Sequence, residues 1–192
     1  LKVANSVVFG RAVKVESVTQ AVTRIGLRQI KSIATAMAVE QMFISNNEVV
    51  SEYMHITWRK TVDVASIAIA LMTRYLQKNK HTAFTLDTLT LAALIHNIGA
   101  LPILTEAENH PEVFAKPIFL QQAIINLANK IGGEVTKAWD FPAEFTELVT
   151  SWSDLTLLPK EAHYLDFIRA GAIYHEIFKS ASTRDILLKS YV

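Results

Sequence analysis

The stretch Leu91-Ala92-Ala93-Leu94-Ile95-His96-Asn97-Ile98-Gly99 decides the fold that this chain is expected to adopt. It continues an apolar segment that starts at Leu86, and such a segment is typical of a helix in a protein core. We predict that this helix covers residues 86–95 and ends near Gly99 and Pro102. The polar pair His96-Asn97 at the end of this apolar run is the most informative feature of the sequence.

The segments before this stretch carry helix signals of their own. Ser17-Val18-Thr19-Gln20 fits a capping box, in which the serine and glutamine side chains bind free backbone N–H groups at a helix start. This helix is predicted to end near Gly26, because glycine readily adopts the left-handed conformation found at helix ends. The next helix is predicted from Leu27 to about Ile44. Its buried stripe has spacings of three and four and consists of Ile30, Ile33, Met37 and Ala38.

A long helix is predicted after Asn46-Asn47, from about Val49 to Gln77. Its central residues 65–71 are apolar almost all round, as expected for a helix in the middle of a bundle. The inner face is predicted to consist of Ala65, Ala68, Ile69 and Met72.

The rest of the chain is predicted to alternate loops and helices. Pro142 and Pro159 are placed where a helix tolerates proline, in its first turn. A short last helix is predicted at about 183–192. No segment shows a clean alternation of apolar and polar residues, which would indicate a strand. We therefore predict an all-α fold without a sheet, with residues 1–192 in a single domain.

Composition narrows the class of protein. The 192 residues are 51% hydrophobic and 19% charged, which favours a globular protein with a large core. A net charge of +1 gives no general attraction to nucleic acid or anionic membranes. There is no cysteine, so a thiolate metal site is excluded. The apolar runs Val64–Met72 and Ile98–Leu104 are too short to span a bilayer, and no signal peptide is visible. A cytoplasmic protein is expected.

Three separated strings resemble the HDOD family, the HD-related output domains. The first is Leu1-Lys2-Val3-Ala4-Asn5-Ser6-Val7-Val8-Phe9-Gly10, followed by Ser17–Val22 and Ile25-Gly26-Leu27. The second is Leu94-Ile95-His96-Asn97-Ile98-Gly99, and the third comprises Gly132, Trp139, Phe141 and Pro142. The resemblance implies a helical bacterial signalling module, found alone or joined to receiver and cyclic-dinucleotide-handling domains. It also implies one or two helices upstream, in agreement with a chain that opens at Leu1 inside an apolar pattern.

The resemblance further implies a degraded metal site. HD-type phosphohydrolases hold a divalent cation with several imidazoles and carboxylates, and the cation activates a water molecule. At the positions that resemble this ligand set, the chain has Lys60, His96, Asn97, Ala128 and Gly171, the last within Ala170-Gly171. A lysine cation repels a metal ion, and a single imidazole does not hold one. We therefore expect no metal, no cofactor and no catalytic residue.

Two hypotheses concern the remains of this site. His96 is expected to be a buried histidine bonded to a neighbouring backbone carbonyl or side chain, with binding of a small ligand as the alternative. Lys60 is expected either to place its ammonium near the former metal position, paired with Asp63 or bonded to Asn97, or to be a solvated surface lysine. Trp58, Trp139 and Trp152 are predicted core residues, and Trp152 is also a candidate for filling the cleft.

A basic face is the remaining candidate site. Residues 1–39 contain six basic side chains against Glu16 alone. Arg24, Arg28 and Lys31 would share a helix face if Gly26 does not interrupt it, and could receive an acidic partner, a phosphate or a receiver domain. The alternative is a solvated basic face. No aromatic residues interleave with these charges, so a platform for nucleic acid is not indicated.

The resemblance implies a non-catalytic signalling or regulatory domain that acts through contacts with protein partners or fused signalling domains. Two alternatives stay open. One is a metal-dependent phosphohydrolase acting on a nucleotide or cyclic dinucleotide, and the other is a pseudo-enzyme that binds a nucleotide without cutting it. Neither nucleic acid nor a membrane is an expected partner, and the sequence leaves the oligomeric state open.

Overall fold

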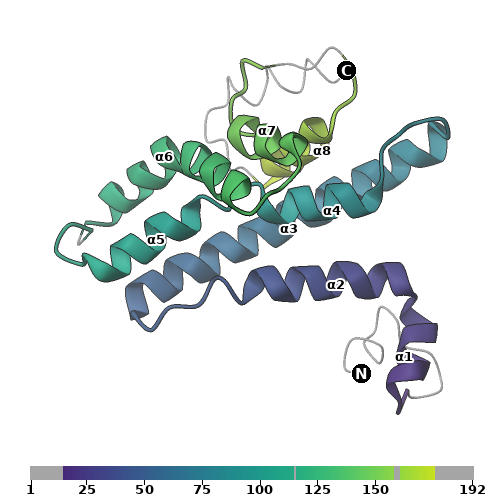
Figure 1. The fold of residues 1–192 in the computed structure, drawn as a ribbon, viewed down its shortest axis with the longest axis horizontal. Helices are drawn as coiled ribbons and strands as arrows, with labels where there is room; N and C mark the ends of the chain where they lie inside the picture. Colours follow the sequence, from purple (N-terminus) through teal and green to yellow (C-terminus); the bar gives the residue numbers. More distant parts are fainter. Residues whose placement is uncertain (1–14, 115, 158–160, 176–192) are drawn as a thin grey trace. The chain divides into compact units, whose positions relative to one another are not determined.

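The computed structural model describes residues 15–114, 116–157 and 161–175, and these residues form helices and no strand (Figure 1). The all-α prediction is confirmed. The helices are α1 (Val18–Ile25), α2 (Leu27–Glu40), α3 (Glu48–Lys78), α4 (Leu86–Ile95), α5 (Ala100–Asn109), α6 (Pro117–Ala138), α7 (Ala143–Ser151) and α8 (Tyr164–Tyr174). The predicted helix at 183–192, Pro159 and the string Leu1–Gly10 lie outside the described residues.

The chain divides into two compact units, residues 1–38 and 39–192. Each unit is described here by itself. The assignment of residues 1–192 to a single domain stays a prediction.

The first unit is organised by the capping box that the sequence predicts. The backbone N–H of Gln20 donates to Ser17 Oγ at 3.2 Å, and the side-chain oxygen of Gln20 accepts from the N–H of Ser17 at 3.3 Å. Gly26 has a φ of 87° and ends α1 as predicted. A small core forms from Val15, Ala21, Ile25, Ile30 and Ile33.

The predicted end and stripe of α2 need correction. The helix ends at Glu40, because the N–H groups of Met42 and Phe43 bind the carbonyls of Val39 and Glu40 in tight turns. Met37 is 59% exposed and Ala38 is also exposed, so the predicted buried stripe does not extend past Ile33. The buried residue at this end of α2 is Val39.

Helix α3 is the long helix that the sequence predicts, and it is central to the second unit. The side chain of Asn47 caps it by accepting from the N–H groups of Val49 and Val50 at 3.0 and 3.2 Å. Ala65, Ala68 and Met72 are buried as predicted, whereas Ile69 is half-buried. Helix α4 lies along α3 (Figure 1), and α5 and α8 also pack against α3.

Helices α4 and α5 together form the most apolar part of the described chain. By length and composition, the segment Leu86–Asn109 would pass as a membrane-crossing helix, because it contains an 18-residue window with a mean hydropathy of 1.5. However, 72% of that window is buried inside the protein. A turn at residues 96–99 also divides the segment into two helices. We therefore assign it to the core.

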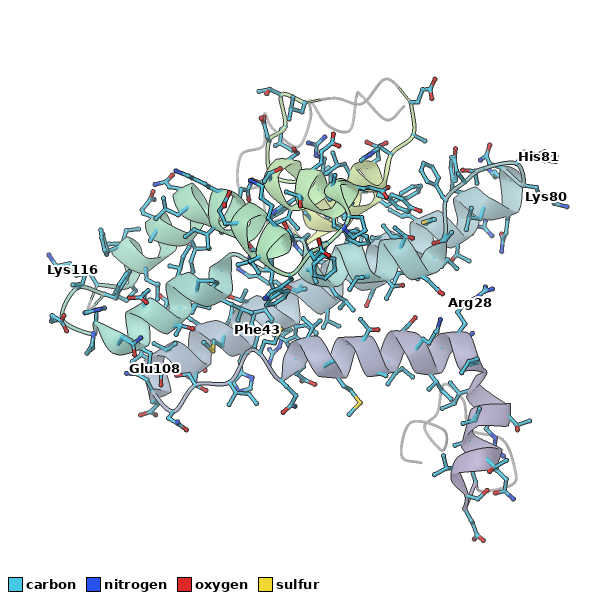
Figure 2. All side chains as sticks on the ribbon, in the orientation of Figure 1. Arg28, Phe43, Lys80, His81, Glu108 and Lys116 are labelled. Atoms are coloured by element: carbon cyan, nitrogen blue, oxygen red, sulfur yellow. The ribbon has the colours of Figure 1, made fainter. Side chains whose placement is uncertain are left out.

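The second unit has two distinct ends (Figure 2). Lys80 and His81 project where α3 ends, while Glu108 and Lys116 lie at the opposite end, where α5 and α6 are joined. Glu108 fixes the loop before α3, because its carboxylate accepts from the N–H of Asn46 at 3.2 Å. In that loop Phe43 packs on Trp58 of α3, with ring centroids 5.4 Å apart.

Candidate functional site

His96 lies at the C-terminal end of α4, in the turn that leads into α5. Its side chain is only 2% exposed. Ring atom Nδ1 lies 2.7 Å from the carbonyl oxygen of Ala93. Because a carbonyl can only accept, Nδ1 carries the proton in this contact, and in the neutral ring Nε2 keeps its lone pair. The prediction of a buried histidine bonded to a backbone carbonyl is confirmed.

Burial keeps the His96 ring neutral. Removal of the ring from water lowers its pKa from 6.5 to about 4, while the hydrogen bond to Ala93 acts in the opposite direction. A charged imidazolium would lose its hydration at this place without gaining a counter-charge. The ring is therefore uncharged at physiological pH.

Trp152 covers His96. The two rings meet edge to face, with centroids 4.6 Å apart and an interplanar angle of 84°. Trp152 is itself 7% exposed and lies directly after α7. The side chain proposed to fill the cleft therefore packs against the histidine of the His-Asn pair.

The turn after His96 is pressed against α6. A Cβ atom at Gly99 would lie 1.9 Å from the carbonyl oxygen of Ala128 and 2.4 Å from the backbone nitrogen of Gly132. Only glycine allows this approach. Ala128, where the resemblance would place a histidine, is buried and contributes its backbone to the contact.

Gly171 has a similar role between α8 and α3. A Cβ atom here would lie 2.6 Å from the carbonyl oxygen of Val64. A carboxylate-bearing side chain at this position would therefore require α8 to move away from α3. In the present packing Gly171 serves a close helix contact.

Lys60 and Asp63 do not form the predicted pair. Lys60 is exposed on α3, and among the described residues no hydrogen bond or salt bridge joins it to Asp63 or Asn97. Asp63 instead lies 3.9 Å from Nδ1 of His175, at the end of α8. The six predicted site residues thus fall into groups: His96, Asn97 and Ala128 near Gly99, then Asp63 and Gly171 near Val64, with Lys60 exposed.

The predicted basic face is not continuous. Arg24 belongs to α1, whereas Arg28 and Lys31 belong to α2, because the backbone conformation of Gly26 ends the first helix. Arg28 and Lys31 are exposed, and Figure 2 shows Arg28 projecting from α2. Arg24 is half-buried. The three residues therefore do not share one helix face.

The assignment of Trp139 to the core is wrong. Its side chain is 48% exposed and faces Phe141 with ring centroids 6.3 Å apart. Trp139 follows the last residue of α6, where the chain turns through Asp140 with a positive φ of 56°. The ring is therefore carried outside the helix packing. Trp58 is half-buried.

Sequence reasoning missed Arg169 in α8, which is 0% exposed. Its guanidinium donates to the backbone carbonyls of Ser151, Trp152, Asp154 and Leu157. A signal was present in the sequence. Arg169 lies four residues after Leu165 and three before Ala172, within the apolar stripe of α8.

The described residues do not fit a divalent metal centre. No three histidine, aspartate or glutamate side chains in the described ranges lie close enough together to hold an ion. Of the residues aligned with the ligand set, only His96 offers an imidazole, and its open nitrogen lies in a core closed by Trp152. Ala128 and Gly171 have no donor atom, and the Asn97 side chain offers a neutral amide.

Comparison with known proteins places this fold. The model of the HDOD domain family matches residues 1–154. A crystal structure from Shewanella amazonensis SB2B, of a "putative metal-dependent phosphohydrolase", is 47% identical, with a TM-score of 0.84. The similarity covers 99% of this chain and 68% of that one. No match was found among curated proteins. The chain belongs to the HDOD domain family.

Proposed function

We propose that this chain is a non-catalytic regulatory domain, which acts in the bacterial cytoplasm through contacts with protein partners or fused signalling domains. The observation that carries the proposal is the surroundings of His96. Trp152 covers its ring, and no three histidine, aspartate or glutamate side chains in the described ranges lie close enough together to hold an ion. A metal-activated hydrolase needs an open coordination position and several further ligands around such a histidine.

The packing around the turn supports the same proposal. Gly99 and Gly171 bring backbones into contact at positions where a Cβ atom has no space. Restoring a ligand there would require helices to separate.

A phosphohydrolase is the alternative that a specific observation favours. The Shewanella amazonensis SB2B protein bears that description and is 47% identical over nearly the whole chain. His96 also keeps a hydrogen bond from Nδ1 to a carbonyl, which is how metal-ligating histidines are commonly oriented. A pseudo-enzyme that binds a nucleotide without cutting it would use the same region.

Elemental analysis combined with hydrolysis assays tests the proposal. We expect the purified chain to contain no stoichiometric Mn, Fe, Mg or Zn and to release no product from phosphomonoesters, nucleotides or cyclic dinucleotides. His81→Ala serves as a matched control, because His81 is exposed. Stoichiometric metal together with turnover that His96→Ala abolishes and His81→Ala leaves intact would reject the proposal. Calorimetry with a nucleotide panel distinguishes the pseudo-enzyme, which would bind without turnover.

The regulatory part of the proposal needs a separate test. We expect Arg28→Glu combined with Lys31→Glu to weaken the output of the domain in cells, that is, its binding to a protein partner, because an acidic partner would then be repelled. Arg74→Glu combined with Lys78→Glu is the matched control, since both are exposed basic residues on a different helix, α3. Equal loss of output in both variants would argue against this face of α2 as the partner surface.

A further inference from the structure

Arg169 is the largest fully buried side chain in the described part of the chain, with 0% exposure. A guanidinium remains charged at every pH at which proteins are folded, so its burial requires compensation. None of the salt bridges among the described residues involves Arg169. The compensation must therefore come from other groups.

Backbone carbonyls provide that compensation. Nε of Arg169 donates to the carbonyl of Trp152 at 3.1 Å, and Nη1 donates to that of Leu157 at 2.5 Å. Nη2 donates to the carbonyls of Ser151 and Asp154 at 2.8 and 2.6 Å. The last carbonyls of a helix lack partners within the helix and form the negative end of its dipole. Arg169 thus binds the end of α7 and the loop behind it.

The loop contributes a second, weaker charge contact. Asp154 has a lowered pKa, mainly because its carboxylate accepts from the hydroxyl and backbone N–H of Thr156, and to a smaller extent because of the positive charge of Arg169. The loop of residues 151–157 is therefore organised by its own turn, by the guanidinium from α8, and by Asn129 of α6, whose side-chain amide donates to Ser153 Oγ at 2.7 Å.

This guanidinium is connected to His96 through a single residue. The carbonyl of Trp152 is bound by Arg169, and the ring of the same tryptophan lies edge to face on His96. A tryptophan ring stays in place only if the backbone that carries it is fixed. Arg169 fixes that backbone from the side of α8.

We propose that Arg169 is a positioning residue that latches residues 151–157 to α8 and thereby holds Trp152 over His96. Release of the latch frees the loop and opens His96 to solvent. The latch is independent of the proposed function, because it acts in the same way whether or not the domain hydrolyses a substrate.

Arg169→Lys tests the latch with little change in charge. Lysine keeps the positive charge but lacks the planar fork that reaches four carbonyls at once. Histidine modification by diethyl pyrocarbonate, mapped by mass spectrometry, measures the opening. We expect His96 to be protected in the unmodified chain, and we expect the rate at which diethyl pyrocarbonate modifies His96 to rise about tenfold or more in Arg169→Lys. His81 and His110, which are exposed, should react equally in both proteins.

Two further variants distinguish the effect of Arg169 on residues 151–157 from the effect of the Trp152 ring on His96. Trp152→Leu should expose His96 while the loop stays resistant to thermolysin, because Arg169 still binds its carbonyls. Arg169→Lys should make both His96 and the loop accessible. Arg59→Lys, at an exposed position, should change neither. Protection of His96 in a helical, folded Arg169→Lys protein would overturn the proposal.

If Arg169→Lys does not fold, hydrogen exchange in the unmodified chain decides. The proposal expects the Nε–H of Arg169 and the backbone N–H of Trp152 to open with the same free energy, because they belong to one unit. Rapid exchange of the Arg169 Nε–H beside a protected Trp152 N–H would overturn it.

Discussion

At the scale of single residues, the site is defined by what each predicted site residue contacts. His96 binds a backbone carbonyl and a tryptophan edge, Gly171 allows α8 to touch α3, and Lys60 points to solvent. Lys60 therefore does not supply the positive charge expected beside His96 and Asn97. The buried guanidinium of the described residues belongs to Arg169, which binds backbone carbonyls.

Stability should depend on pH through His96. The folded-state pKa of about 4 lies below the ordinary 6.5, so the unfolded chain binds the proton more tightly. The His96 contribution to the free energy of unfolding is therefore fully present above pH 6.5 and is lost as the pH falls from 6.5 to 4, with no further loss below pH 4. Over this range the free energy of unfolding decreases by about 3 kcal/mol. Urea unfolding at a series of pH values measures it.

His96→Gln is the control for this pH dependence. Glutamine does not titrate, so the His96 contribution between pH 6.5 and 4 should disappear from the stability profile. A profile equally steep in the unmodified chain and in His96→Gln would show that other groups cause the loss.

Gly99→Ala should be strongly destabilising. The added Cβ atom meets backbone atoms of Ala128 and Gly132, which cannot move without shifting α6. We expect a loss of about 3 kcal/mol or more, at the upper end of overpacking effects. Gly133→Ala is the comparison, because its Cβ atom meets the side-chain methyl group of Thr150 at 2.6 Å, which can rotate. Equal losses in thermal unfolding would contradict the account of Gly99.

At the scale of elements, side-chain caps fix the start of several helices. Ser17 and Gln20 start α1, Asn47 starts α3, and His163 with Asp166 starts α8. Helix α8 carries both Arg169 and Gly171, so the cap at His163 sets the position of the latch and of the contact with α3.

Removal of the α3 cap should cost stability without changing the fold. In Asn47→Ala the N–H groups of Val49 and Val50 lose their acceptor. We expect a decrease of about 1 kcal/mol in the free energy of unfolding, measured with urea. Asn47→Asp keeps an acceptor and places a negative charge at the helix start, so it should retain the stability. A similar loss in both variants would show that the cap is not the cause.

At the scale of the whole molecule, periodicity and caps predicted α1 to α4, but neither the bounds of α5 to α8 nor the packing partners of the helices. The bounds of α3 and α4 follow from local patterns, and so does the end of α1 at Gly26. The exposure of Met37 and Trp139 depends on which elements lie nearby, which local patterns do not contain. The roles of Ala128, Gly171 and Arg169 depend on long-range backbone contacts, so the sequence marked the first two as lost ligands and missed the third.

The most direct test of the central claim follows the histidine ring signals by NMR while Mn²⁺ is added to the intact chain. The account predicts that the His96 signals stay unbroadened, since the ring is buried against Ala93 and Trp152. Exposed His81 and His110 report weak, unspecific contact with the ion. Saturable broadening of the His96 signals at one Mn²⁺ ion per chain would contradict the account, because it would show a working metal site.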